Sequence, residues 1–99
     1  MVDTSLTDPL GRAITLHDRT WFGHIVKGHP EVADCRDLAE HALRQPQQIR
    51  LSATDPDCRK YLGPGPRDGV KILVIADVAE GLVKTAYLTK RPTGDIEWP

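Results

Sequence analysis

The chain has 99 residues, of which 27% are charged and 39% hydrophobic, and its formal net charge at pH 7 is −1. This length favours a single domain over residues 1–99, and the patterned apolar runs exclude a disordered polypeptide. A net charge near zero argues against a protein that coats nucleic acid nonspecifically, because such binding depends on neutralising phosphates. A net charge near zero is still compatible with a local cluster of positive charge.

Cysteine content and hydropathy argue against further classes of protein. The two cysteines, Cys35 and Cys58, form no close pair, so the sequence predicts neither a disulfide framework nor a zinc module. No apolar run approaches the roughly 20 residues needed to cross a bilayer, and residues 1–10 lack the pattern of a signal peptide. We therefore expect a cytoplasmic globular protein that does not associate with a membrane.

Residues 1–17 are predicted to form an N-terminal arm or a short strand. Ala13, Ile14 and Leu16 alternate loosely with polar residues after the turn-prone run Asp8-Pro9-Leu10-Gly11. Helical patterns begin after this arm and occupy residues 18–45.

The segment from Trp21 to Pro30 predicts an amphipathic helix with a histidine beside its apolar face, and Asp18 or Thr20 can cap its start. At 100° per residue, four side chains share the apolar arc: Trp21, Phe22, Ile25 and Val26. His24 falls just outside that arc. Gly28 suits a C-terminal cap and Pro30 disfavours helical backbone at His29, so the helix should end there. His29 would then face the negative end of the helix dipole, where imidazolium is favoured.

A second amphipathic helix is predicted to begin at Pro30 and to end before Pro46. Proline is well suited to the first turn of a helix. The predicted buried face contains five residues: Val32, Cys35, Ala39, Ala42 and Leu43.

From residue 46 to residue 99 the pattern changes to short β-rich runs separated by Gly, Pro and Asp, which predicts an antiparallel sheet. The most apolar run, 70–76, predicts a central strand. Further strands are expected at 48–52, 58–62 and 82–90, followed by a closing run at 96–98. The predicted fold class is therefore α+β, with two N-terminal helices packed on a four-stranded or larger antiparallel sheet.

Two of the predicted strands carry polar stripes. Side chains alternate along a strand, so Arg59 and Tyr61 point to one face and Lys60 to the other, whereas Thr85 and Tyr87 share a face. If the stripes lie on the same side as His24, one site would combine an imidazole, a guanidinium, a hydroxyl and phenols. The sequence leaves the relative orientation of the stripes open.

This set of groups suits the transesterification of RNA. The reaction needs a base for the 2′-hydroxyl, an acid for the leaving 5′-oxygen and a cation for the phosphate oxygens. His24 suits the acid or base, Arg59 the cation, and Thr85 a hydrogen-bond donor to a nonbridging oxygen. The hypothesis requires all three side chains to converge in one pocket. The competing explanation is structural, because histidines beside apolar faces and basic residues on strands are commonly packed or solvated.

Other kinds of site fit less well. His24 and His29 are five residues apart, so their rings do not share a helical face, and we expect neither a metal nor another cofactor. The run Gly63-Pro64-Gly65-Pro66 is too rich in proline to present the backbone N–H groups of a phosphate-binding loop.

Several short motifs follow one another in a characteristic order: Trp21 with His24-Ile25, His29-Pro30, Pro46 before a strand, Arg59-Lys60-Tyr61, Thr85-Ala86-Tyr87 and Ile96-Glu97-Trp98. This order resembles the barnase-EndoU-colicin-RelE (BECR) superfamily of metal-independent ribonucleases, especially its phage- and mobile-element-associated branches. The resemblance implies an active site of His24, Arg59 and Thr85. We assign four further residues to substrate binding: His29, Lys60, Tyr61 and Tyr87. One departure is Tyr61-Leu62, where such proteins often have two consecutive aromatic residues.

The leading hypothesis is a metal-independent endoribonuclease that leaves a 2′,3′-cyclic phosphate, as the toxin of a toxin–antitoxin or phage system. Its partners would be an RNA substrate and a cognate antitoxin protein. The alternative is a non-catalytic module of the same fold that binds protein or RNA. A third possibility is a subunit whose site is completed by a partner or a second copy.

Overall fold

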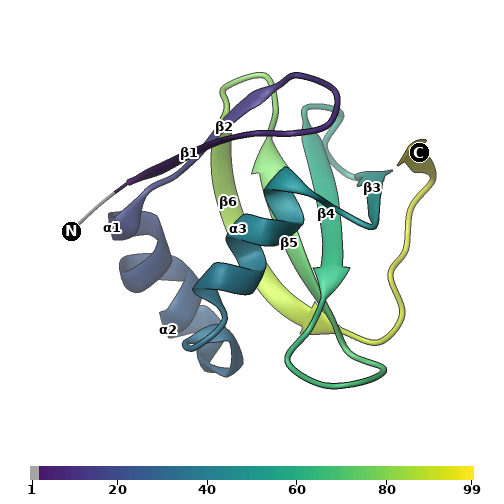
Figure 1. Ribbon diagram of the computed structural model, residues 1–99. Helices are drawn as coiled ribbons and strands as arrows, with labels where there is room; N and C mark the ends of the chain where they lie inside the picture. The colour runs from purple at the N-terminus through teal and green to yellow at the C-terminus, as the bar shows by residue number, and fades with distance from the viewer. Residues whose placement is uncertain (1–2) are drawn as a thin grey trace.

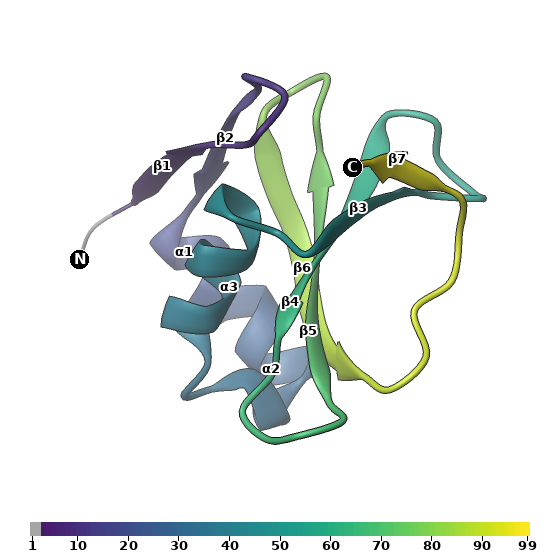
Figure 2. The same ribbon diagram turned by 45° about the vertical axis from the view of Figure 1, so that its right-hand side comes forward.

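The computed structural model describes residues 3–99, which form one seven-stranded sheet with helices packed on one side (Figures 1 and 2). Two strands precede the helices, β1 (Thr4–Thr7) and β2 (Ala13–Leu16). Five strands follow them: β3 (Gln48–Leu51), β4 (Cys58–Pro64), β5 (Lys71–Asp77), β6 (Leu82–Thr89) and β7 (Ile96–Trp98). The strand order is β1-β2-β6-β5-β4-β3-β7.

The α+β class is confirmed, but the predicted arrangement is corrected in two respects. The helices follow a β1–β2 hairpin instead of opening the fold, and the sheet is mixed, because β2 pairs with β6 in parallel at Thr15 and Leu82. The strand β1 escaped prediction because Leu6 is its one apolar side chain. The hairpin turn is held instead by Asp8, whose Oδ1 accepts the N–H groups of Leu10 and Arg12.

Helical backbone runs from Asp18 to Gly28 in three segments: α1 (Asp18–Thr20), the π-helix η1 (Trp21–Ile25) and α2 (Val26–Gly28). In the π turn the N–H of Val26 donates to the carbonyl of Trp21, five residues back. The extra residue in this turn changes the helical wheel. Trp21 and Ile25 are buried as predicted, whereas Phe22, predicted in the apolar arc, is 58% exposed. The predicted end is confirmed, because His29 has left the helical region with φ −136°.

The second predicted helix is divided. Its start is a 3₁₀ turn, η2 (Pro30–Val32), and α3 (Arg36–Arg44) begins only after a break. Tight i→i+3 bonds, from Val32 N–H to the His29 carbonyl and from Cys35 N–H to the Val32 carbonyl, replace α-helical bonds here. All five side chains of the predicted buried face are nevertheless buried.

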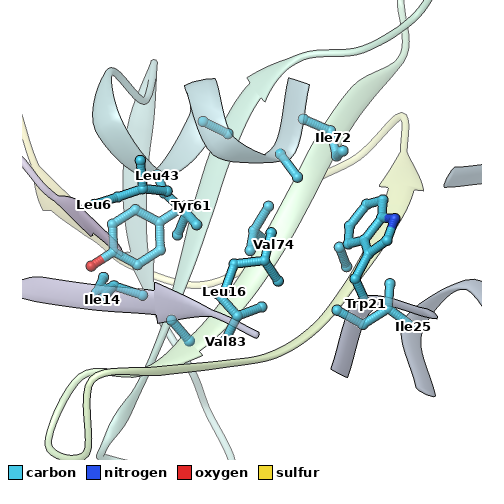
Figure 3. Close-up of a cluster of buried hydrophobic side chains, with 14 of the residues drawn as sticks. Leu6, Ile14, Leu16, Trp21, Ile25, Leu43, Tyr61, Ile72, Val74 and Val83 are labelled. Atoms are coloured by element: carbon cyan, nitrogen blue, oxygen red, sulfur yellow. The ribbon is translucent and has the colours of Figure 1, made fainter. Parts of the chain in front are cut away.

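The core lies between the helices and one face of the sheet (Figure 3). Trp21 and Ile25 contribute from η1, Leu43 from α3, and the ring of Tyr61 from β4. Among residues 3–99, no helix combines the length and apolar content that a membrane crossing requires.

The opposite side of the sheet, which we call the outer face, is crossed by the segment between β6 and β7 (Figure 2). Cross-strand pairs join Leu62 with Leu73 and Leu73 with Tyr87 on this face. Leu62 and Leu73 are buried, and the Lys60 ammonium donates to the Thr93 hydroxyl of the crossing segment at 3.1 Å.

Candidate functional site

An open pocket of about 440 Å³ lies where the α1–η1 segment packs beside the first residues of β6. Seven residues line it: His17, Thr20, His24, Leu82, Val83, Lys84 and Thr85. The predicted catalytic residues His24 and Thr85 therefore share one pocket, although they are far apart in the sequence.

The helical wall of the pocket carries three polar side chains in one stripe. His17, Thr20 and His24 are spaced by three and four residues, which places them along one side of a helix. The π turn falls at the His24 end of this stripe. Insertions of this kind in helices are frequent at functional sites.

The strand wall of the pocket contains a β-bulge. Ile75 of β5 pairs with Thr85, but the next residue, Ala76, pairs with Val83, so Lys84 is an extra residue on β6. Four consecutive residues of β6 line the pocket, Leu82, Val83, Lys84 and Thr85, and the bulge lies among them. Bulges are enriched beside active sites.

The predicted substrate-binding residues Tyr87 and His29 lie next to one another beside the pocket. Their ring centroids are 5.4 Å apart and the rings are tilted by 32°. Tyr87 shares the outer face with Thr85, two residues away, which is about 7 Å along a strand. His29 is followed by Glu31, whose carboxylate lies 3.5 Å from the imidazole Nδ1.

Lys60 faces the same side of the sheet as Thr85. Lys60 pairs with Ile75, and Ile75 pairs with Thr85, so the three form one row across β4, β5 and β6 on the outer face. Two strand spacings separate the backbones of Lys60 and Thr85, about 10 Å.

Arg59 and Tyr61 point to the opposite side of the sheet, so the predicted alternation along β4 holds but the site lies on the face of Lys60. The structure does not bring Arg59 to the pocket. Its guanidinium Nε donates to Glu97 at 2.7 Å, and Nη1 donates to the Pro56 carbonyl at 2.7 Å. Tyr61 is fully buried in the core, where its hydroxyl donates to Asp8 Oδ2 at 2.5 Å.

Asp8 and Tyr61 belong to a network of part-buried charges. Arg12 joins Asp8 at 2.7 Å to Glu97 at 2.6 Å. Burial alone would raise the pKa of Asp8, but hydrogen bonds from Tyr61 and Arg12 outweigh it and leave the pKa below its ordinary value. Burial alone would also raise the pKa of Glu97, but hydrogen bonds from Arg12 and Arg59 outweigh it and leave this pKa below its ordinary value. For Tyr61, burial and then the bond to Asp8 both raise the pKa. These residues are held in fixed charge states by one another, which suits a structural role.

Three cationic side chains on the outer face have no carboxylate partner among residues 3–99. Arg50 donates to Gln48 and to the Gly94 carbonyl, Lys60 to Thr93, and Lys71 to Gln47. None of the three lies within ion-pair distance of a carboxylate among residues 3–99. A chain with a net charge of −1 thus presents uncompensated positive charge on the face that adjoins the pocket.

Three polar residues of the pocket were not predicted as site residues: His17, Thr20 and Lys84. The sequence favours a surface role for His17, because it lies among polar residues. The spacing of His17, Thr20 and His24 was an available signal, since i, i+3 and i+7 share one side of a helix. Lys84 could not be predicted, because its place beside the helical segment depends on tertiary packing and on the register of β5 with β6.

Within residues 3–99, no three His, Cys, Asp or Glu side chains gather as a set of metal ligands. Comparisons with protein-family models, curated proteins and solved structures found no match to this chain. Function is therefore inferred from the pocket and from the face beside it.

Proposed function

We propose that this protein is a metal-independent endoribonuclease that acts at the pocket containing His24, Lys84 and Thr85. The observation that carries the proposal is this convergence of a proton-transfer group, a cation and a hydroxyl in one open pocket. The resemblance to BECR ribonucleases supports it through His24 and Thr85. Lys84 takes the place that the sequence favoured for Arg59, which is engaged by Glu97.

The pocket provides what cleavage by the neighbouring 2′-hydroxyl requires. His24 transfers a proton during the displacement at phosphorus. Lys84 and Thr85 bind the nonbridging oxygens, where negative charge increases in the transition state. The products are a 2′,3′-cyclic phosphate and a free 5′-hydroxyl.

The outer face supports RNA as the substrate class. An RNA strand that leaves the pocket over Thr85 meets Lys60 and then Arg50 in the same row of the sheet, and Lys71 lies on the same face opposite Thr89. The His29–Tyr87 ring pair offers a surface on which an unstacked base can pack. Single-stranded RNA presents both the spaced phosphates and the free bases that this arrangement can contact.

The proposal is tested with purified protein, a single-stranded RNA and EDTA. Cleavage should persist in the chelator and should leave a 2′,3′-cyclic phosphate, and replacing the 2′-hydroxyl at the cut site by hydrogen should abolish it. His24→Ala should slow cleavage by about 10²- to 10⁴-fold. His41→Ala is the matched control, since this histidine lies on α3 and does not line the pocket, and it should cleave at the wild-type rate.

Two other outcomes would redirect the assignment. A folded protein that binds RNA or a protein partner but cuts no RNA would be the non-catalytic module. Growth arrest on expression that is lost with His24→Ala and relieved by a co-expressed protein would support the toxin–antitoxin setting.

A further inference from the structure

A second histidine reaches the same pocket from the start of the helix. His17 is the N-cap residue of α1 and lines the pocket together with His24. Its side chain is 39% exposed, so the ring is accessible to a substrate in the pocket. Loss of this ring leaves the backbone bond from Trp21 N–H to the His17 carbonyl in place.

Asp3 fixes the orientation of this imidazole. Asp3 Oδ2 lies 2.9 Å from Nδ1 of His17, and Asp3 Oδ1 accepts the N–H of Asp18 at 2.9 Å. The hydrogen bond from Asp18, and then that from His17, lowers the pKa of Asp3, which keeps the carboxylate ionised near neutral pH. A carboxylate that accepts Nδ1–H selects the tautomer whose Nε2 carries a free lone pair.

Building on the proposed ribonuclease activity, we infer that His17 is a second catalytic residue that acts as the general base, with Asp3 as its positioning residue and His24 as the general acid. Nε2 of His17 takes the proton of the 2′-hydroxyl while the 2′-oxygen forms a bond to phosphorus. The bond from phosphorus to the 5′-oxygen breaks, and the imidazolium of His24 gives its proton to that oxygen. Atoms and charge balance without a further reactant.

Charged groups lie on both sides of His17. Asp3, Asp18 and Arg19 surround it on the side away from the pocket, and His24 and Lys84 lie within the pocket. The mechanism needs a neutral base and a protonated acid at the same time. The rate of the wild-type protein should therefore follow a bell-shaped curve, with an acidic limb from His17 and an alkaline limb from His24.

Two substrates assign the two roles. Wild type, His17→Ala and His24→Ala are compared on an RNA dinucleotide and on a ribonucleoside 3′-(4-nitrophenyl phosphate), whose leaving group needs no proton. Both variants should lose about 10²- to 10⁴-fold on the dinucleotide. On the nitrophenyl ester, His24→Ala should recover to within about tenfold of wild type, whereas His17→Ala should stay slow because it lacks the base. The acidic limb should vanish in His17→Ala and the alkaline limb in His24→Ala.

Asp3→Asn tests the positioning role. The amide oxygen can still accept the Asp18 N–H, but the amide nitrogen next to Nδ1 favours the wrong tautomer, so kcat should fall with KM little changed. Asp3→Glu should restore part of kcat. Asp34→Asn, in the turn before α3, is the matched control and should behave as wild type.

Failure of this inference differs from failure of the proposed function. If wild type cleaves, His24→Ala does not, and folded His17→Ala keeps the full rate and both limbs of the pH curve, the role of His17 is refuted and the ribonuclease stands. If the nitrophenyl ester rescues His17→Ala and not His24→Ala, the assigned roles are overturned. If folded wild type cleaves neither substrate, the proposed function and the inference fall together.

Discussion

Arg12, at the start of β2, donates a 2.6 Å hydrogen bond to Glu97 on β7, although four strands separate β2 from β7 in the order of the sheet. The two can meet only because the sheet curves strongly around its core. Arg59 of β4 donates to the other oxygen of Glu97, and Asp8 completes the network from the hairpin turn. This cluster holds the first hairpin and the last strand together on the side of the sheet opposite the outer face.

The unfolding free energy should reach a plateau between about pH 5 and pH 8 and fall on both sides, since burial raises the pKa of the Cys35 and Cys58 thiols as well as that of the Tyr61 phenol. Asp8 and Glu97 have a lower pKa in the folded state, so the unfolded chain binds more protons, and stability is lost as the pH falls below about 4–5. The pKa of Tyr61 is raised by folding, so the unfolded chain loses its phenolic proton first, and stability is lost as the pH rises above about 10. Urea titrations across this range measure both limbs, and a monotonic curve would contradict the expectation.

Tyr61→Phe isolates the alkaline limb. The substitution leaves the ring in the core but removes the hydrogen bond to Asp8, which should cost about 1–3 kcal/mol of unfolding free energy at neutral pH. The decline above pH 10 should become shallower at the same time. Tyr87→Phe is the matched control, since Tyr87 lies outside this network on the outer face, and its alkaline decline should equal that of wild type.

Gly63 is required where α3 approaches β4. A Cβ at this position would lie 2.9 Å from Cβ of Ala42 and 3.3 Å from its Cα, so the helix would have to move away from the sheet. Gly63→Ala should therefore lower the unfolding free energy by about 1–3 kcal/mol. Gly23→Ala makes the same chemical change where nothing lies within 4 Å, and it should leave stability unchanged or raise it by up to about 1 kcal/mol. Equal effects of the two substitutions would refute the packing argument.

Lys60 and Arg59 should differ in function because they lie on opposite faces of β4. Lys60→Ala should weaken RNA binding and reduce the slope of log Kd against log salt by about 1, with little change in stability. Arg59→Ala should lower the unfolding free energy by about 1–3 kcal/mol through the loss of its bond to Glu97, and the folded variant should keep the salt dependence of wild type. The reverse assignment of effects would place the substrate on the helix-covered face.

Much of the fold follows from local pattern. The apolar run at 70–76 predicts the central strand, Gly28 and Pro30 predict the helix end, and alternation predicts that Arg59 and Lys60 face opposite ways. These features depend on neighbours in sequence, so a single sequence contains them.

The remaining features depend on contacts between distant segments. Alternation along β4 cannot show which face the helices cover. The sequence pattern therefore favoured Arg59, whereas the structure places Lys60 in the same cross-strand row as Thr85. The parallel contact of Thr15 with Leu82 arises only when distant strands align, and the bulge at Lys84 depends on the register of β5 with β6. The π turn likewise moved Phe22 out of the arc that a regular helix predicts.

The two walls of the pocket come from segments that are synthesised at different times, because about 60 residues separate His24 from Lys84. Asp3, His17 and His24 leave the ribosome early, whereas Lys84 and Thr85 belong to the last long strand to emerge. A nascent chain that ends before β6 contains His17 and His24 but lacks Lys84 and Thr85. Assembly of the proposed site therefore waits until β6 has left the ribosome, and a ribosome-bound fragment that stops before β6 has no completed pocket.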